Sequence, residues 1–173
     1  MRLDMTCDTC TFCTNADCRE ENECEDGAGC DDWDASFEYY SKIVDDAPWY
    51  IREQYKRCRI SYYKFLDLLI KDEQGIGIEI NIYDAIEKIY NLTSWELAEI
   101  LNVSRGVLGY ARTRKTVDKR KKQFSDRLHI PQKYFDRFLS TQLEELKQFK
   151  KEFYEFYGAD TIARIKQKAL DVQ

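Results

Sequence analysis

The chain has 173 residues, of which 43% are hydrophobic and 34% charged, and it contains only 2 Pro and 7 Gly. This length fits one compact domain or two small ones, and the scarcity of Pro and Gly favours helices over a turn-rich β fold. No apolar run is long enough to cross a membrane, and the N-terminal stretch lacks the apolar core of a secretory signal. We therefore expect a cytoplasmic protein.

The net charge of −5 hides two halves of opposite sign. Residues 1–50 carry 14 acidic and 3 basic side chains, whereas residues 51–173 carry 18 acidic and 24 basic ones. Within 105–122 there are 8 basic side chains and a single acid, Asp118. This asymmetry predicts different partners for the two halves, or contact between them.

Six of the 7 cysteines lie between residues 7 and 30, in the spacing C-x2-C-x2-C-x4-C-x5-C-x5-C. The segment is acidic and almost free of apolar side chains, so it cannot fold by burying surface. A C-x2-C turn presents two thiolates to one zinc ion, and structural zinc takes four ligands. We therefore predict a structural zinc site. The expected ligands are Cys7, Cys10, Cys18 and Cys30, with Cys13 and Cys24 as alternates.

Two alternatives stay open for these cysteines. An iron–sulfur cluster also uses C-x2-C pairs, but the usual Cys-Pro is missing because Arg19 follows Cys18. Thiols or disulfides are the other alternative, and disulfides need an oxidising compartment. A catalytic zinc usually recruits histidine, and the one histidine, His129, is remote. Cys58 stands alone in a helical pattern and is expected to be a buried thiol.

Hydrophobic spacing predicts the elements between residues 33 and 82. Residues 33–45 form an expected helix, and residues 49–69 form a long helix or a helix pair, with Pro48 in its first turn. A loop is expected over 71–75. Strict alternation over 76–82 predicts a short strand.

The C-terminal part has the longest periodic pattern. Apolar residues recur every three or four positions over 132–157, which predicts one helix of about 25 residues that packs across the core or pairs with a second copy. Gly158 is the expected C-cap, and Asp160 is expected to cap a last helix over 161–170. The predicted fold class is therefore mainly α, with at most one short β element. The expected domains are a Cys-rich acidic metal-binding segment (1–34), a helical segment (35–75), a helix-turn-helix unit (76–135) and C-terminal helices (136–173).

The stretch 92–135 can be interpreted almost residue by residue. Thr93 or Ser94 can cap a helix. Asn102 suits the left-handed conformation at a turn, and Ser104 can cap the next helix. Along the two helices, Leu97, Ala98, Leu101, Leu108 and Ala111 are expected to face inward, and Arg105, Gly106, Gly109 and Tyr110 to face outward.

This stretch resembles the helix-turn-helix of phage repressors of the XRE/Cro type, whose second helix lies in the DNA major groove. The resemblance implies that Arg105 and Tyr110 read bases and that the basic run behind them contacts phosphates. Gly106 and Gly109 count against base readout, because glycine has no side chain to reach a base edge. The candidate nucleic-acid-binding residues are Arg105, Tyr110, Arg112, Arg114, Lys115, Lys119, Arg120, Lys121 and Lys122.

No catalytic constellation stands out in the sequence. It contains neither a Ser/His/Asp set nor an H-E-x-x-H motif, and its acid clusters lie in a segment too polar to form an apolar pocket. We therefore expect a protein that is not an enzyme.

Two functional hypotheses follow. A small protein that joins a repressor-like helix-turn-helix to extra modules resembles the type II anti-CRISPR proteins of Gram-positive prophages. That resemblance implies an inhibitor that binds Cas9 and blocks target-DNA loading or cleavage, and it is preferred because it accounts for both charged halves. The candidate partner surface is Glu20, Glu21, Glu23, Glu25, Asp26, Asp31, Asp32 and Asp34. The alternative is a DNA-binding transcription regulator that forms a homodimer through its long C-terminal helix.

Overall fold

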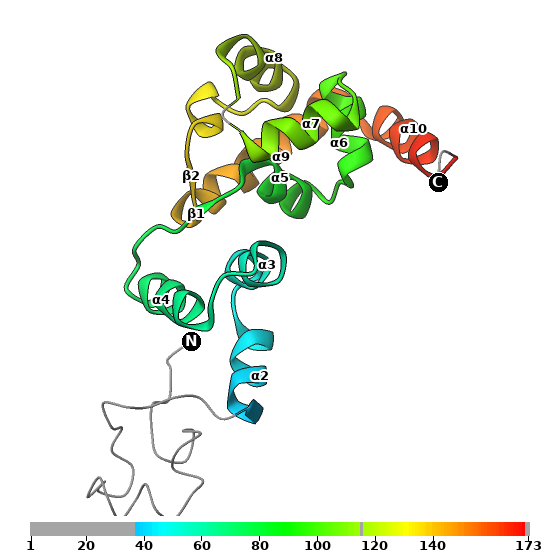
Figure 1. Cartoon of the computed structure of the whole chain (residues 1–173). Coiled ribbons are helices and arrows are strands. Elements are labelled where there is room, and N and C mark those ends of the chain that lie inside the picture. Colours follow the sequence, from blue (N-terminus) through cyan, green and yellow to red (C-terminus); the bar gives the residue numbers. More distant parts are fainter. Residues whose placement is uncertain (1–36, 115, 172–173) are drawn as a thin grey trace, which may run out of the picture. The chain divides into compact units, whose positions relative to one another are not determined.

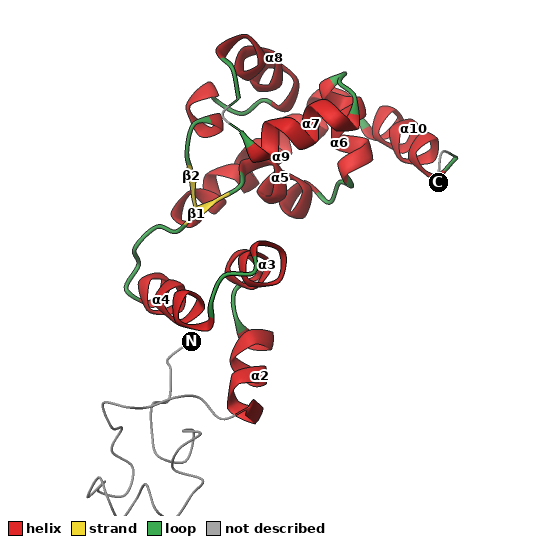
Figure 2. Ribbon diagram, viewed as in Figure 1, coloured by secondary structure: helices red, strands yellow, loops and turns green. Residues whose placement is uncertain are grey.

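The computed structural model describes residues 37–114 and 116–171 (Figure 1). These residues are mainly α-helical, as predicted, and they include one ladder of two short strands (Figure 2). The described residues divide into two compact units, the first ending at Ile76 and the second beginning at Gly77. Among the described residues, every helix is too short or too polar to cross a bilayer.

The described part of the first unit contains three helices, α2 (Phe37–Asp46), α3 (Trp49–Cys58) and α4 (Tyr62–Glu73). Pro48 occupies the N-cap of α3, and Arg59 ends that helix with a φ of 49°. The residues 49–69 therefore form a helix pair rather than one helix. The loop predicted over 71–75 is shorter than expected, because α4 continues to Glu73.

Apolar side chains hold these helices together, and Cys58 is not among them. The buried residues are Ile43, Val44, Ala47, Ile51, Phe65, Leu68 and Leu69. The Tyr50 hydroxyl donates to Asp72 Oδ1 at 2.7 Å and so ties α3 to α4. Cys58 is exposed, so the expectation of a buried thiol was wrong. It is the last residue of α3 and lies among exposed basic side chains, where no helix of the described residues covers it.

The second unit begins with a short strand and four helices. They are β1 (Glu79–Ile80), α5 (Ile82–Tyr90), α6 (Ser94–Leu101), α7 (Arg105–Thr113) and α8 (Asp118–Leu128). A 3₁₀ helix (Gln132–Phe135), β2 (Phe138–Leu139), a second 3₁₀ helix (Ser140–Gln142), α9 (Leu143–Tyr157) and α10 (Ala159–Leu170) follow. The strand predicted over 76–82 is thus confirmed in place but is only two residues long.

The prediction of one helix over 132–157 was wrong. Strand β2 interrupts the stretch and pairs antiparallel with β1, with Phe138 opposite Ile80 and Leu139 opposite Glu79. Phe138 is buried, so this non-local pairing competes successfully with helix formation. Gly77 allows the close approach, because a Cβ there would lie 3.1 Å from Thr141 Oγ1 and 3.3 Å from Leu139.

Helix α10 begins earlier than expected. Gly158 has a φ of 72°, which glycine tolerates best, and it serves both as the C-cap of α9 and as the N-cap of α10. Asp160 therefore lies in the first turn of α10 instead of capping it. A carboxylate in the first turn still interacts favourably with the positive end of the helix dipole.

The core of the second unit is aromatic at its centre. The rings of Tyr83, Phe124 and Phe135 lie within 6.0 to 6.2 Å of one another, and all three are buried. Helix α5 packs against α9, and α6 packs against α7, α8 and α10. The Tyr154 hydroxyl donates to the Tyr90 carbonyl at 2.7 Å and so fixes α9 to the end of α5. The pair α6–α7 is therefore packed against helices of the same core, because α6 contacts α8 and α10.

Candidate nucleic-acid interface

Helix α6 starts with the predicted N-terminal cap. The Thr93 hydroxyl accepts from the Glu96 backbone N–H at 3.2 Å, and the Glu96 carboxylate accepts from the Thr93 backbone N–H at 2.6 Å. This reciprocal capping box satisfies two donors that the first turn of a helix leaves free. It explains why Glu96, a charged residue, is buried.

The turn between α6 and α7 is also fixed by local bonds. Asn102 has a φ of 53°, and its N–H donates to the Glu99 carbonyl at 3.0 Å. The Val103 N–H donates to the Ala98 carbonyl at 3.0 Å, which completes a Schellman motif. The Ser104 hydroxyl then accepts from the Val107 N–H at 3.3 Å and caps α7. The predicted turn chemistry is confirmed at Asn102 and Ser104.

Helix α7 presents the face that its pattern predicts. Leu108 is buried and Ala111 is half-buried, whereas Arg105, Gly106, Gly109 and Tyr110 are exposed. The Arg114 guanidinium lies 4.8 Å from the centre of the Tyr110 ring and also donates to its hydroxyl at 3.0 Å. The C-terminal end of α7 therefore carries an exposed Tyr110–Arg114 pair.

Arg112 points back into the fold. Its guanidinium forms an ion pair with Glu87, lies 3.5 Å from Asp84 and donates to Ser94 Oγ at 3.1 Å. Only 20% of the side chain is exposed. Arg112 thus connects α7 to α5 and α6, and its charge is already compensated, which removes it from the expected phosphate contacts.

Lys121 is held in a similar way. It forms ion pairs with Asp136 and, at 3.1 Å, with Asp118, and 12% of its side chain is exposed. The hydrogen bond to Asp136, followed by that to Asp118, raises the pKa of Lys121 above its ordinary value. Lys121 therefore stays charged, but its charge serves the contact between α8 and the segment before β2.

The remaining basic residues divide by exposure. Arg120 is half-buried and donates to Gln123 Oε1 at 2.9 Å. Arg105, Lys119 and Lys122 are exposed and have no ion-pair partner in the described part of the chain. Lys115 lies outside the described residues. The exposed cations among the described candidates are thus Arg105, Arg114, Lys119 and Lys122, and we call them the exposed basic set.

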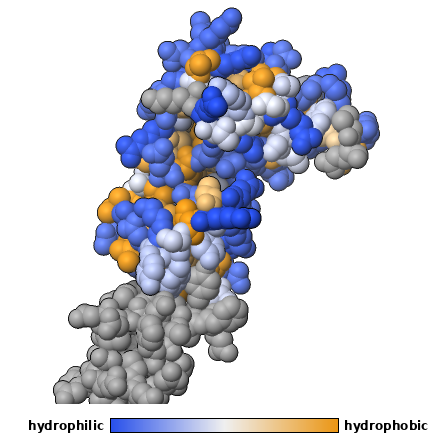
Figure 3. Space-filling model, viewed as in Figure 1, coloured by the Kyte–Doolittle hydropathy of each residue, from blue (hydrophilic) through white to orange (hydrophobic). Residues whose placement is uncertain are grey.

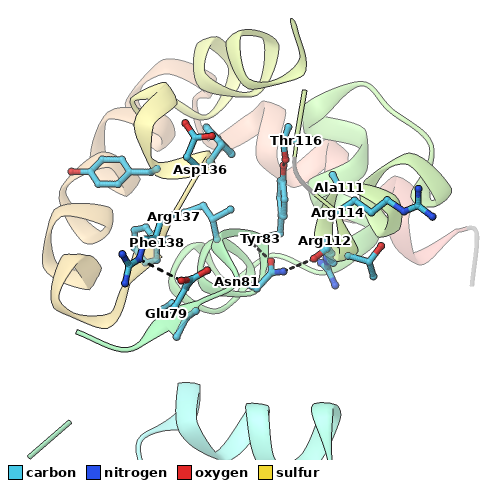
Figure 4. Close-up of a pocket in the computed structure, with 15 residues that line it drawn as sticks. Glu79, Asn81, Tyr83, Ala111, Arg112, Arg114, Thr116, Asp136, Arg137 and Phe138 are labelled. Atoms are coloured by element: carbon cyan, nitrogen blue, oxygen red, sulfur yellow. Dashed lines mark hydrogen bonds and ion pairs between the residues drawn. The ribbon is translucent and has the colours of Figure 1, made fainter. Parts of the chain in front are cut away.

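A pocket of about 220 Å³ lies behind the C-terminal end of α7 (Figure 4). Asn81 donates to the Arg112 carbonyl at 2.9 Å, and its side-chain oxygen accepts from the Tyr83 N–H at 3.0 Å. Tyr83 points at Thr116, and their hydroxyls are 2.7 Å apart (Figure 4). No local sequence pattern signals this pocket, because it forms where residues 79–83, residues 111–114 with Thr116, and residues 134–138 meet.

The Asn81 side chain in the wall of this pocket holds the end of α7 through its bond to the Arg112 carbonyl. Glu79 and Arg137, which also line the pocket, form an ion pair at 3.4 Å between exposed side chains. Burial raises the pKa of Tyr83 above its ordinary value, so this hydroxyl stays protonated. The pocket therefore supports the end of α7 structurally.

The predicted metal ligands Cys7, Cys10, Cys18 and Cys30, with the alternates Cys13 and Cys24, lie outside the described residues. So do all the acidic residues proposed for a partner surface, Glu20 to Asp34. Within the described ranges, no three side chains of the metal-binding types come together.

Comparisons of the chain with protein-family models, with curated proteins and with solved structures find no match. The surface of the second unit therefore has to be interpreted from its own geometry and charge.

Proposed function

We propose that the second unit binds duplex DNA through the outward face of α7 and the exposed basic set, and that the chain acts as a DNA-binding regulator. The observation that supports this most is the α6–α7 turn, whose caps fix α7 with Arg105 at its start and the Tyr110–Arg114 pair at its end. A helix presented in this way is the part of a helix-turn-helix that enters the major groove.

Charge supports the same proposal. Phosphate contacts supply most of the affinity of non-specific DNA binding, because each releases condensed counterions from the DNA, and each needs a side-chain cation that is exposed and not already paired within the protein. Arg105, Lys119 and Lys122 meet that condition, because they are exposed and unpaired within the described part of the chain. The face of the second unit visible in Figure 3 is mainly hydrophilic, which suits a charged ligand better than an apolar one.

The test is the affinity of the full chain for a labelled duplex of mixed sequence, measured by fluorescence anisotropy. Arg105→Ala and Lys122→Ala are each expected to weaken binding about fivefold at low salt, because each removes a phosphate contact. The matched control is Lys151→Ala on α9, which removes the same charge from a side chain that is 81% exposed. Equal affinities for all three variants would contradict the proposal.

A second candidate function is inhibition of Cas9, as in the anti-CRISPR proteins. The charge asymmetry favours it, because the 14 acidic residues among the first 50 would repel DNA but suit a protein surface that binds phosphates. Excess chain added to Cas9 and its guide should then block cleavage of target DNA. Unimpaired cleavage would rule this target out, whatever the outcome of the DNA measurement.

We also propose that the Cys-rich segment holds one zinc ion, through Cys7, Cys10, Cys18 and Cys30. The support is the C-x2-C spacing in a segment with too few apolar residues to form a core. Elemental analysis of the purified chain should give about one zinc per chain, and a Cys7→Ser, Cys10→Ser double variant should lose it. If the analysis finds iron and sulfide in place of zinc, the segment holds an iron–sulfur cluster. A chain that contains no metal would contradict both the zinc site and the cluster.

A further inference from the structure

A hollow that the proposed function does not explain lies beside α7, at the start of α6. It is lined by Ser94, Arg105, Gly106, Leu108, Gly109 and Arg112. Both glycines are exposed, and they are three positions apart, so they share one face of the helix. Leu108 is buried beside them. The middle of the face that should meet a ligand therefore has no side chain.

The fold does not require glycine at either position. A Cβ added at Gly109 would meet nothing within 4 Å, and one added at Gly106 would meet only the Ser104 hydroxyl at 3.8 Å. Neither residue has a positive φ. Glycine weakens an exposed helix relative to alanine, because it loses more backbone freedom on folding. Two such residues in one short helix are costly to stability, and among the described residues no close contact requires either of them.

The chemistry around the hollow favours an anion. Arg105 lies on its rim, exposed and unpaired within the described residues. Ser94 contributes a hydroxyl, and no carboxylate lines the hollow. Arg112 forms part of the wall, but Glu87 and Asp84 compensate its charge. A partner helix would bury apolar side chains here, whereas the accessible lining groups are cationic, polar or bare backbone.

We infer that this hollow receives the sugar–phosphate edge of a nucleic-acid strand, so that the α7 backbone itself touches the strand between Gly106 and Gly109. The inference rests on the proposed DNA binding and adds to it a direct contact between the α7 backbone and one strand. Arg105 then binds a phosphate oxygen at the rim, and base discrimination is left to the Tyr110–Arg114 pair. We call this contact the glycine seat, formed by Gly106 and Gly109.

The experiment combines thermal unfolding with duplex binding for Gly106→Ala, Gly109→Ala and the bulkier Gly109→Gln in the full chain. Each alanine variant should unfold about 4 °C higher than the parent, because helix propensity rises. Each should bind the mixed-sequence duplex about tenfold more weakly, and Gly109→Gln more weakly still. The salt dependence should not change, because no charge is altered.

The matched control is Thr113→Ala. It improves helix propensity in the same helix, and Thr113 does not line the hollow, so its affinity should equal that of the parent. Glycine variants that are stabilised and bind as tightly as the parent would overturn the glycine seat and leave DNA binding intact. Variants that unfold would overturn it too, because glycine would then be needed by the fold. A parent chain that binds no duplex would overturn both.

Discussion

At the scale of single residues, the Arg112 guanidinium is paired inside the fold, where it joins α7 to α5. It belongs to a run of basic residues, and that run predicts phosphate contacts. The structure pairs it with Glu87, which lies 25 positions earlier, on another helix. No local pattern signals such a pairing, because it depends on how α5 and α7 pack. Lys121 and Asp136 repeat the case between α8 and the segment before β2.

Two buried tyrosines make a matched pair for measuring stability. Tyr90 is fully buried, and its hydroxyl has no hydrogen-bond partner among the described residues, whereas the Tyr83 hydroxyl bonds to Thr116. Removing an unsatisfied group relieves its desolvation penalty, while removing a bonded one leaves its partner unpaired. Tyr90→Phe should therefore leave the free energy of unfolding unchanged or raise it by about 1 kcal/mol, and Tyr83→Phe should lower it by about 1 kcal/mol. Urea denaturation followed by circular dichroism measures both. The opposite order would contradict the packing described.

The same hydroxyls set a dependence on alkaline pH. Burial raises the pKa of Tyr83 and of Tyr90 above the ordinary value of 10.0. Above that value the unfolded chain releases protons that the folded chain retains, so stability is fully present below pH 10.0 and falls as the pH rises further. The fall should approach about 1.4 kcal/mol per pH unit for each of these tyrosines. Urea midpoints measured on both sides of this value should show it, and Tyr90→Phe should make it shallower. Stability that holds well above this pH would contradict the shift.

At the scale of elements, the sequence predicts those turns and caps that are held by hydrogen bonds between residues close together in the chain. The α6–α7 turn follows from residues within a few positions of one another, namely Thr93, Glu96, Asn102 and Ser104. For that reason its caps and its direction could be predicted from the sequence. The interruption of 132–157 could not, because β2 exists only through its pairing with β1, about 60 positions away. Periodic apolar spacing fits both one helix and a shorter helix preceded by a strand.

Asn102 offers the sharpest test of the turn. Its φ of 53° suits glycine and asparagine but strains other residues, alanine included, because their Cβ crowds the backbone carbonyl in the left-handed region. Asn102→Ala should lower the free energy of unfolding by about 1 kcal/mol, whereas Asn102→Gly should be close to neutral. Denaturant midpoints of the two variants check this. If alanine were tolerated as well as glycine, the turn would have another conformation in solution.

At the scale of the whole molecule, the charge asymmetry remains the feature that any function has to explain. The 24 basic residues after position 50 suggest a nucleic acid, and the acidic first 50 suggest a basic partner or a metal-bound segment. The structure reduces the number of basic residues available to a nucleic acid, because it separates cations that are paired inside the fold from cations that face solvent. The mainly helical architecture could be predicted from the composition and from the spacing of apolar residues. Which cations are paired could not, because the pairing depends on how the helices pack.

The most direct test of the central claim is the salt dependence of duplex binding by the full chain. The exposed basic set contains Arg105, Arg114, Lys119 and Lys122, and each phosphate contact contributes about −0.9 to the slope of log K against log salt concentration. We expect binding at low salt with a slope of about −4. Absence of duplex binding at about 50 mM salt, or an affinity that does not change between about 50 mM and 200 mM, would contradict it.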